Sequence, residues 1–132
     1  MSDSGWTAVA VLVARLIFAA LFAMAVTFKL VDIDATAGQI AAAGFPLSQV
    51  LAWLAVIFEL ALVVCLLTGL YFAPAALLAA AYVVFLGFAF HGPDRWAANQ
   101  NEFGFFIDHF TFTAGLLYAA AHGPGRWLTV RR

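Results

Sequence analysis

Charge is scarce in this sequence. Of its 132 residues only 10% are charged, 66% are hydrophobic, and the net charge is −1. A balance so close to neutral excludes a basic surface for nucleic acid. Cysteine is almost absent too, because Cys65 is the single one. One cysteine cannot form a disulfide within the chain, and it argues against a Cys-ligated zinc or iron–sulfur site, so we expect no metal centre.

Long apolar runs fill the rest of the chain, whose mean hydropathy of +1.02 is typical of an integral membrane protein. The run Leu51–Leu70, LAWLAVIFELALVVCLLTGL, is long enough as a helix to cross the ~30 Å core of a bilayer. Met1–Gly5 lacks the basic residues that open a signal peptide, so we expect the first apolar run to be retained as a span.

Turn-forming residues divide these runs. The apolar stretch 47–90 is too long for one crossing, and Thr68, Gly69 and Pro74 mark its only plausible break. The sequence HGPG at His122–Gly125 ends the last run. Residues 35–45 are Ala/Gly-rich, and we expect a loop or a short interfacial helix there. The expected spans are approximately 6–28, 47–67, 74–90 and 103–121.

Four spans predict one all-α domain over residues 1–132, an antiparallel four-helix bundle with both ends of the chain on one side. Arg126, Arg131 and Arg132 follow the last span, whereas the opposite side holds Lys29 and Arg95. Three basic residues against two favour cytoplasmic termini by the positive-inside rule. The predicted location is therefore a membrane that the chain crosses several times, with both termini in the cytoplasm.

Two charges lie deep within the expected spans. Arg15 is about nine residues from the start of the first span, and Glu59 about eleven from the inner end of the second. A rise of ~1.5 Å per residue gives them similar depths. Because an isolated charge in lipid is costly, we predict a buried Arg15–Glu59 ion pair.

Four further polar residues fall in the outer half of the bundle, at a mouth next to the polar loop 91–102. They are Lys29, His91, Asp108 and His109. A carboxylate and imidazoles close together suit proton transfer or binding of a polar head group. Three of these residues also have simpler explanations: Lys29 as an interfacial side chain, His91 as a helix cap, and His109 as a contact to a neighbouring helix. The Arg15–Glu59 pair, likewise, could serve only as a structural brace.

The order of these features resembles a known family. Arg15 lies in VARLIFAALFAMAVTFKL, which Lys29 nearly closes; GFPL follows at Gly44–Leu47, then the Glu59 run and FAPAALLAAAYVVFLGFAFH, which ends at His91. The pattern, over about residues 15–120, resembles the DoxX family of small four-helix bacterial membrane proteins. Asp108 and His109 stand where that family often carries a lysine–asparagine or similar polar pair.

The resemblance implies a membrane partner of redox systems, and two functions follow from it. The first is a subunit of, or accessory to, a quinone-linked redox or respiratory complex, with a quinone as the possible ligand of the outer mouth and the enzymatic role left open. The alternative is a non-catalytic structural subunit or assembly factor that packs on a larger membrane complex. A haem held by His91 and His109 is not favoured, and neither is a transporter, because the chain shows no internal repeat.

Overall fold

The protein is helical throughout the part that can be described. A computed structural model describes residues 5–130, and within them there is no strand. The elements are α1 (Gly5–Val31), α2 (Ile33–Ala42), α3 (Ser48–Thr68), α4 (Phe72–His91), the short 3-10 helix η1 (Pro93–Arg95) and α5 (Asn101–His122). The all-α prediction is confirmed. Residues 1–4 and 131–132 lie outside the described part, and with them the two termini and the Arg131 and Arg132 used in the orientation prediction.

Three of the described helical segments are long and apolar enough to cross a membrane. They are Gly5–Val31, Ser48–Thr68 and Phe72–Arg95. Helix α5 has 22 residues but is more polar, with Glu102, Asp108 and His109 in its first half, and it is not among the three. The fourth crossing and the antiparallel four-helix bundle therefore stay predictions.

Helix boundaries follow local chemistry. Gly69 ends α3 in the left-handed region, at φ 80°, and its N–H bonds to the Cys65 carbonyl over 2.9 Å. Helix α4 begins at Phe72, two residues before the predicted start, because Pro74 is tolerated in a first turn whose N–H groups have no intrahelical partner. The segment predicted as a loop or short helix is helical: the Asp32 carboxylate caps α2 by accepting from the Ala35 N–H over 3.0 Å.

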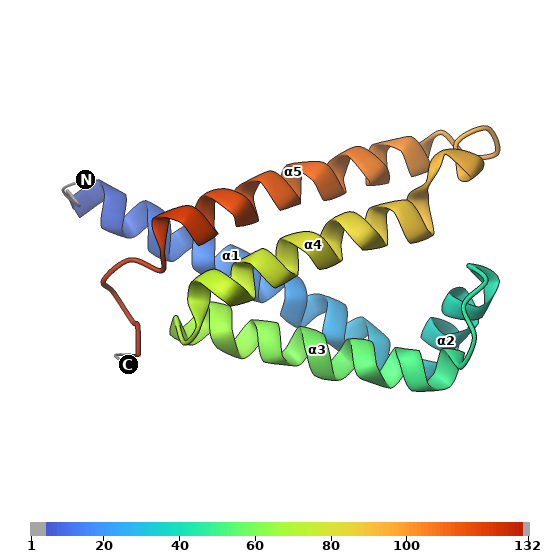
Figure 1. The fold of residues 1–132 in the computed structure, drawn as a ribbon, viewed down its shortest axis with the longest axis horizontal. Coiled ribbons are helices and arrows are strands. Elements are labelled where there is room, and N and C mark those ends of the chain that lie inside the picture. The colour runs from blue at the N-terminus through green and yellow to red at the C-terminus, as the bar shows by residue number, and fades with distance from the viewer. Residues whose placement is uncertain (1–4, 131–132) are drawn as a thin grey trace. The chain divides into compact units, whose positions relative to one another are not determined.

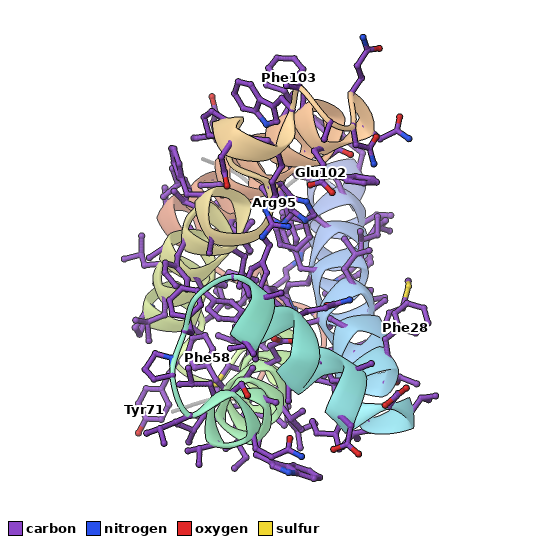
Figure 2. All side chains as sticks on the ribbon, turned by 90° about the vertical axis from the view of Figure 1, so that its right-hand side faces the viewer. Phe28, Phe58, Tyr71, Arg95, Glu102 and Phe103 are labelled. Carbon is purple, nitrogen blue, oxygen red and sulfur yellow. The ribbon has the colours of Figure 1, made fainter. Side chains whose placement is uncertain are left out.

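The chain forms two compact units, and the first contains α1, α2, α3 and the segment from Pro124 onward. Helices α1 and α3 pack together along buried stripes. The α1 stripe is Ala8, Arg15, Ala19, Phe22 and Val26, and the α3 stripe is Ala52, Val56, Glu59, Leu62 and Leu66. Another face of α1 is an exposed apolar stripe that suits lipid contact: Val13, Ile17, Leu21, Met24 and Phe28. Figure 2 shows Phe28 pointing outward from α1.

The second unit runs from Tyr71 to Gly123 and contains α4, η1 and α5. Its two long helices form a hairpin closed by the 92–100 loop (Figure 1). Gly87 lets them approach closely, since a Cβ at this position would lie 3.1 Å from the His109 Cβ. Within the membrane-capable part of this unit, α4 also buries Ala75, Ala76, Ala79 and Ala80, small residues typical of tightly packed membrane helices.

If α5 crosses the bilayer, its two ends face opposite compartments. We expect single cysteines introduced as Asn99→Cys and Arg126→Cys, in a Cys65→Ala background, to react with a membrane-impermeant maleimide from opposite sides of sealed vesicles. A matched reporter at Leu70 should label together with position 126, because the Thr68 carbonyl accepts from the Val130 N–H over 2.8 Å. Labelling of positions 99 and 126 from one side would disprove the fourth crossing.

Candidate functional site

The first unit buries two charges to the same degree, and one of them is Arg15, whose residue is 1% exposed. A guanidinium has five N–H donors and no acceptor. All five are used here, and each goes to a backbone carbonyl. Nε donates to Leu66 over 3.0 Å, Nη2 to Leu67 over 2.7 Å and to Leu128 over 2.6 Å, and Nη1 to Pro124 over 2.9 Å and Trp127 over 2.8 Å. Arg15 therefore binds two separate pieces of backbone at once.

The first piece is the last turn of α3. The carbonyls of a final helical turn have no N–H partner within the helix, and they carry the negative end of its dipole. Leu66 and Leu67 lie in this turn, since α3 ends at Thr68. The arginine thus satisfies polar groups that would otherwise face hydrocarbon, and these groups in turn stabilise its charge.

The second piece is the C-terminal strap, residues 124–130, which follows α5 and returns to the first unit. Its chain bends at Gly125 (φ 79°) and at Leu128 (φ 50°), so that three of its carbonyls converge on Arg15. The strap also packs closely on its neighbours: a Cβ at Gly125 would lie 2.9 Å from Val11 Cγ1, and one at Gly69 would lie 3.0 Å from Thr129 Cγ2. The sequence showed only helix-stopping residues here and no sign of these contacts.

The second embedded charge, Glu59, pairs with Lys29. Lys29 Nζ lies 2.9 Å from Glu59 Oε1, and the side chains are 22% and 1% exposed. The predicted Arg15–Glu59 ion pair is therefore wrong: the carboxylate has an ammonium partner, and every donor of Arg15 is bound elsewhere.

The direction of helical side chains explains why Glu59 pairs with Lys29 and not with Arg15. Contacts run in opposite order along the two helices, with Arg15 near Leu66 and Lys29 near Glu59, so α1 and α3 are antiparallel. Helical side chains lean toward the N-terminus of their own helix. Lys29 and Glu59 consequently lean toward each other, whereas Arg15 leans toward the α3 C-terminus and away from Glu59. Depth counted along the chain placed Arg15 and Glu59 together because it ignored this tilt.

The imidazole site lies where α4 and α5 meet the 92–100 loop and consists of His91, Glu102 and His109. His91 Nδ1 is 2.5 Å from Glu102 Oε2, and the rings of His91 and His109 lie 5.2 Å apart between centroids, at 46°. His109 Nδ1 lies 2.6 Å from the Phe105 carbonyl. A carbonyl or a carboxylate only accepts, so Nδ1 donates in both rings and the neutral form of each leaves Nε2 as an unprotonated nitrogen.

Aromatic rings surround this site within the second unit. Phe105 lies 5.3 Å from the His91 ring between centroids, and the Trp96 indole N–H donates to the His91 carbonyl over 2.9 Å. Trp96 also packs on Phe103 and Phe106, with centroids 4.8 and 5.3 Å away. In Figure 2 Glu102 and Arg95 lie on one side of this loop region, and Phe103 lies on the other. The imidazoles thus have a largely apolar wall and one anionic neighbour.

The four residues predicted for the outer mouth are divided between the two units. His91 and His109 come together, whereas Lys29 belongs to the first unit, where Glu59 is its partner. Asp108 lies on an exposed side of α5 because it is rotated ~100° from His109 on the helix. Glu102, absent from the predicted site, takes the role of carboxylate. The sequence could have indicated Glu102, because it lies in the first turn after the loop and the two helix ends that a hairpin loop connects lie close together. Among residues 5–130 no group of three or more His, Cys, Asp or Glu has the arrangement of a metal site.

Arg15 should not tolerate replacement by lysine, although the charge is kept. Lysine has three donors, so Arg15→Lys leaves at least two of the five carbonyls unpaired, and bonds to a charged group contribute ~1.5–3 kcal/mol each. We expect a loss of roughly 3 kcal/mol or more in unfolding free energy, measured by circular dichroism in mild detergent. The matched control is Arg126→Lys, an exposed arginine, with an expected change within ~0.5 kcal/mol. Equal stability of Arg15→Lys and the parent would refute the role of the carbonyls.

The Lys29–Glu59 pair predicts energetic coupling. Lys29→Met and Glu59→Gln should each destabilise the protein by ~3–5 kcal/mol, because each removes one charge of an ion pair whose carboxylate is buried, and the double variant should recover ~1–3 kcal/mol of the summed loss. The control cycle, Arg15→Met with Glu59→Gln, should be additive within ~0.5 kcal/mol. The reverse pattern, with coupling to Arg15 alone, would contradict the assigned partners.

Comparison with known proteins adds a family. The family model of DoxX matches residues 10–92, which include Arg15, Lys29, Glu59 and His91 and extend from α1 to the end of α4. Neither the curated proteins nor the solved structures contain a match to the chain. The matched segment covers more than half of the 132 residues and includes most of each of the three helical segments that are apolar enough to span a bilayer. The protein is therefore a membrane protein of the DoxX family.

Proposed function

We propose that this protein is a subunit of, or accessory to, a quinone-linked redox or respiratory complex in the bacterial cytoplasmic membrane, with the imidazole site as its ligand- or proton-exchange site. The observation that carries this proposal is the pair of adjacent imidazoles whose Nδ1 atoms are both engaged. Family membership and the membrane-capable helices support the setting.

The chemistry of a quinone suits such a pair. Two-electron reduction of a quinone takes up two protons and yields a hydroquinone, so the head group needs donors and acceptors at its oxygens. Imidazole exchanges protons near neutral pH, and each Nε2 can accept from a hydroxyl or donate to a carbonyl oxygen. The aromatic wall offers an apolar surface for the ring. The electrons would come from a redox centre of a partner subunit.

The proposed orientation keeps both termini in the cytoplasm. Arg126 follows α5, and together with Arg131 and Arg132 it outnumbers Lys29 and Arg95 on the opposite side, as the positive-inside rule requires. This orientation directs the imidazole site and the 92–100 loop toward the outer side of the membrane. A partner that docks there would be periplasmic or would lie in the outer half of the bilayer.

A specific observation favours a second function, that of a non-catalytic structural subunit or assembly factor. The buried charges of the first unit are engaged in structural contacts: Arg15 with five carbonyls, and Glu59 with Lys29. These contacts fix the helices and leave no donor of Arg15 for a ligand. On this reading the exposed apolar faces pack on a larger membrane complex.

Purification from native membranes in mild detergent distinguishes the two functions. A quinone-linked subunit should retain extractable quinone or bind a short-chain ubiquinone analogue, and His109→Ala should lower that binding or the quinone-reductase rate of the complex at least ~10-fold. The matched control is His122→Ala, an exposed histidine outside the imidazole site. A preparation without quinone that still co-purifies with a larger complex, and whose His109→Ala variant behaves like the parent, would support the structural function instead.

A further inference from the structure

We infer that His91 and His109 form a binding site for one divalent transition-metal ion, and that this site binds Cu²⁺ most tightly and Zn²⁺ next. The sequence placed both residues near one loop, but it gave no metal-binding motif, because the two histidines are eighteen positions apart in the chain. The inference rests on how the two rings are held, and it stands whether or not the protein serves a quinone-linked complex.

The first argument is the state of the ring nitrogens. A metal-binding histidine almost always donates its other ring N–H to a carboxylate, a carbonyl or water, which fixes the tautomer and orients the ring. His91 meets this condition through Glu102, and His109 meets it through the Phe105 carbonyl. Each ring therefore already has the hydrogen bond at Nδ1 that orients a metal-binding histidine. Neither Nε2 has a hydrogen-bond partner among the described residues.

The second argument is the spacing of the rings. Imidazole nitrogens bind Zn²⁺ at ~2.0–2.1 Å, so two rings on one tetrahedral ion have centroids ~5 Å apart. The observed separation of His91 and His109 is 5.2 Å. Two features support this separation: the lack of a side chain at Gly87 allows α5 to approach α4 at His109, and the Trp96 indole N–H donates to the His91 carbonyl.

The third argument is charge and access. Glu102 supplies a negative charge next to His91, and the side chains of both residues are partly exposed, at 20% and 26%. An ion can therefore reach the rings, and its charge has a nearby counter-ion. Since no third His, Cys, Asp or Glu within residues 5–130 completes a ligand set, water fills the remaining positions. Such nitrogen–oxygen shells suit Cu²⁺, and Cu²⁺ exceeds Zn²⁺ in affinity for imidazole.

An ion at this site would occupy the nitrogens that exchange protons in the proposed function. Metal binding and proton exchange at the imidazole site are thus mutually exclusive. The same two residues would give the protein a sensitivity to external copper or zinc.

The test uses the full chain, purified in mild detergent with the Cys65→Ala change, so that the thiol cannot reduce Cu²⁺, and stripped of metal with a chelator. Electron paramagnetic resonance with Cu²⁺ alone should show one tightly bound ion per chain with hyperfine coupling to two nitrogens. Calorimetry with Zn²⁺ alone should show the same stoichiometry. His91→Ala and His109→Ala should each weaken binding at least ~10-fold, and Glu102→Gln by ~10–100-fold, as expected for an outer partner.

His122→Ala is the matched control, because it removes an exposed histidine outside the site, and it should bind like the parent. Helical content is checked for every variant, and Glu102→Gln keeps both imidazoles if an alanine variant does not fold. Coupling to one nitrogen, unchanged affinity in His109→Ala and Glu102→Gln, or an equal loss in His122→Ala would overturn the inference. The metal titrations contain no quinone, so a negative result would overturn the metal site without testing the proposed function, which has its own experiment.

Discussion

The first unit depends on one cation, Arg15, which forms no ion pair with a carboxylate among residues 5–130. Arg15 lies in the middle of an apolar helix, and the free energy of its burial is offset by five carbonyl dipoles from α3 and the C-terminal strap. The fork geometry of a guanidinium makes this possible, since a single group reaches several acceptors in a plane. The same contacts hold the strap against α3. The charge of Arg15, which would be destabilising in lipid, thus connects α1 to the C-terminal strap, over one hundred residues away in the chain.

The two units use their ionisable groups in different ways. In the first, Arg15 donates all five of its N–H groups to backbone carbonyls and Lys29 pairs with Glu59, and these contacts specify which helix faces meet. In the second, His91 and His109 are anchored on one side of each ring and open on the other. Groups with all donors engaged favour a structural role, whereas rings with an unengaged nitrogen favour exchange with a ligand. Any chemistry is therefore expected in the second unit.

Local features were predictable from the sequence, and backbone partners were not. Helix lengths and breaks followed from apolar runs and from Gly69 and Pro74, to within a few residues. The proximity of His91 and His109 followed from their position near one loop. The partners of Arg15 could not be foreseen, because every residue carries a carbonyl and composition does not show which will converge. The Lys29–Glu59 pair was within reach of sequence reasoning once the tilt of helical side chains is included.

The order of these contacts along the chain has a consequence for synthesis. Three of the five acceptors of Arg15, the carbonyls of Pro124, Trp127 and Leu128, follow it by more than one hundred residues. Until translation has passed Leu128, α1 holds a guanidinium whose hydrogen bonds cannot all form. The first helix must remain near water, the insertion machinery or lipid head groups during that interval. A chain that stops before Pro124 never completes its first unit, and its unsatisfied arginine distinguishes it from a finished molecule.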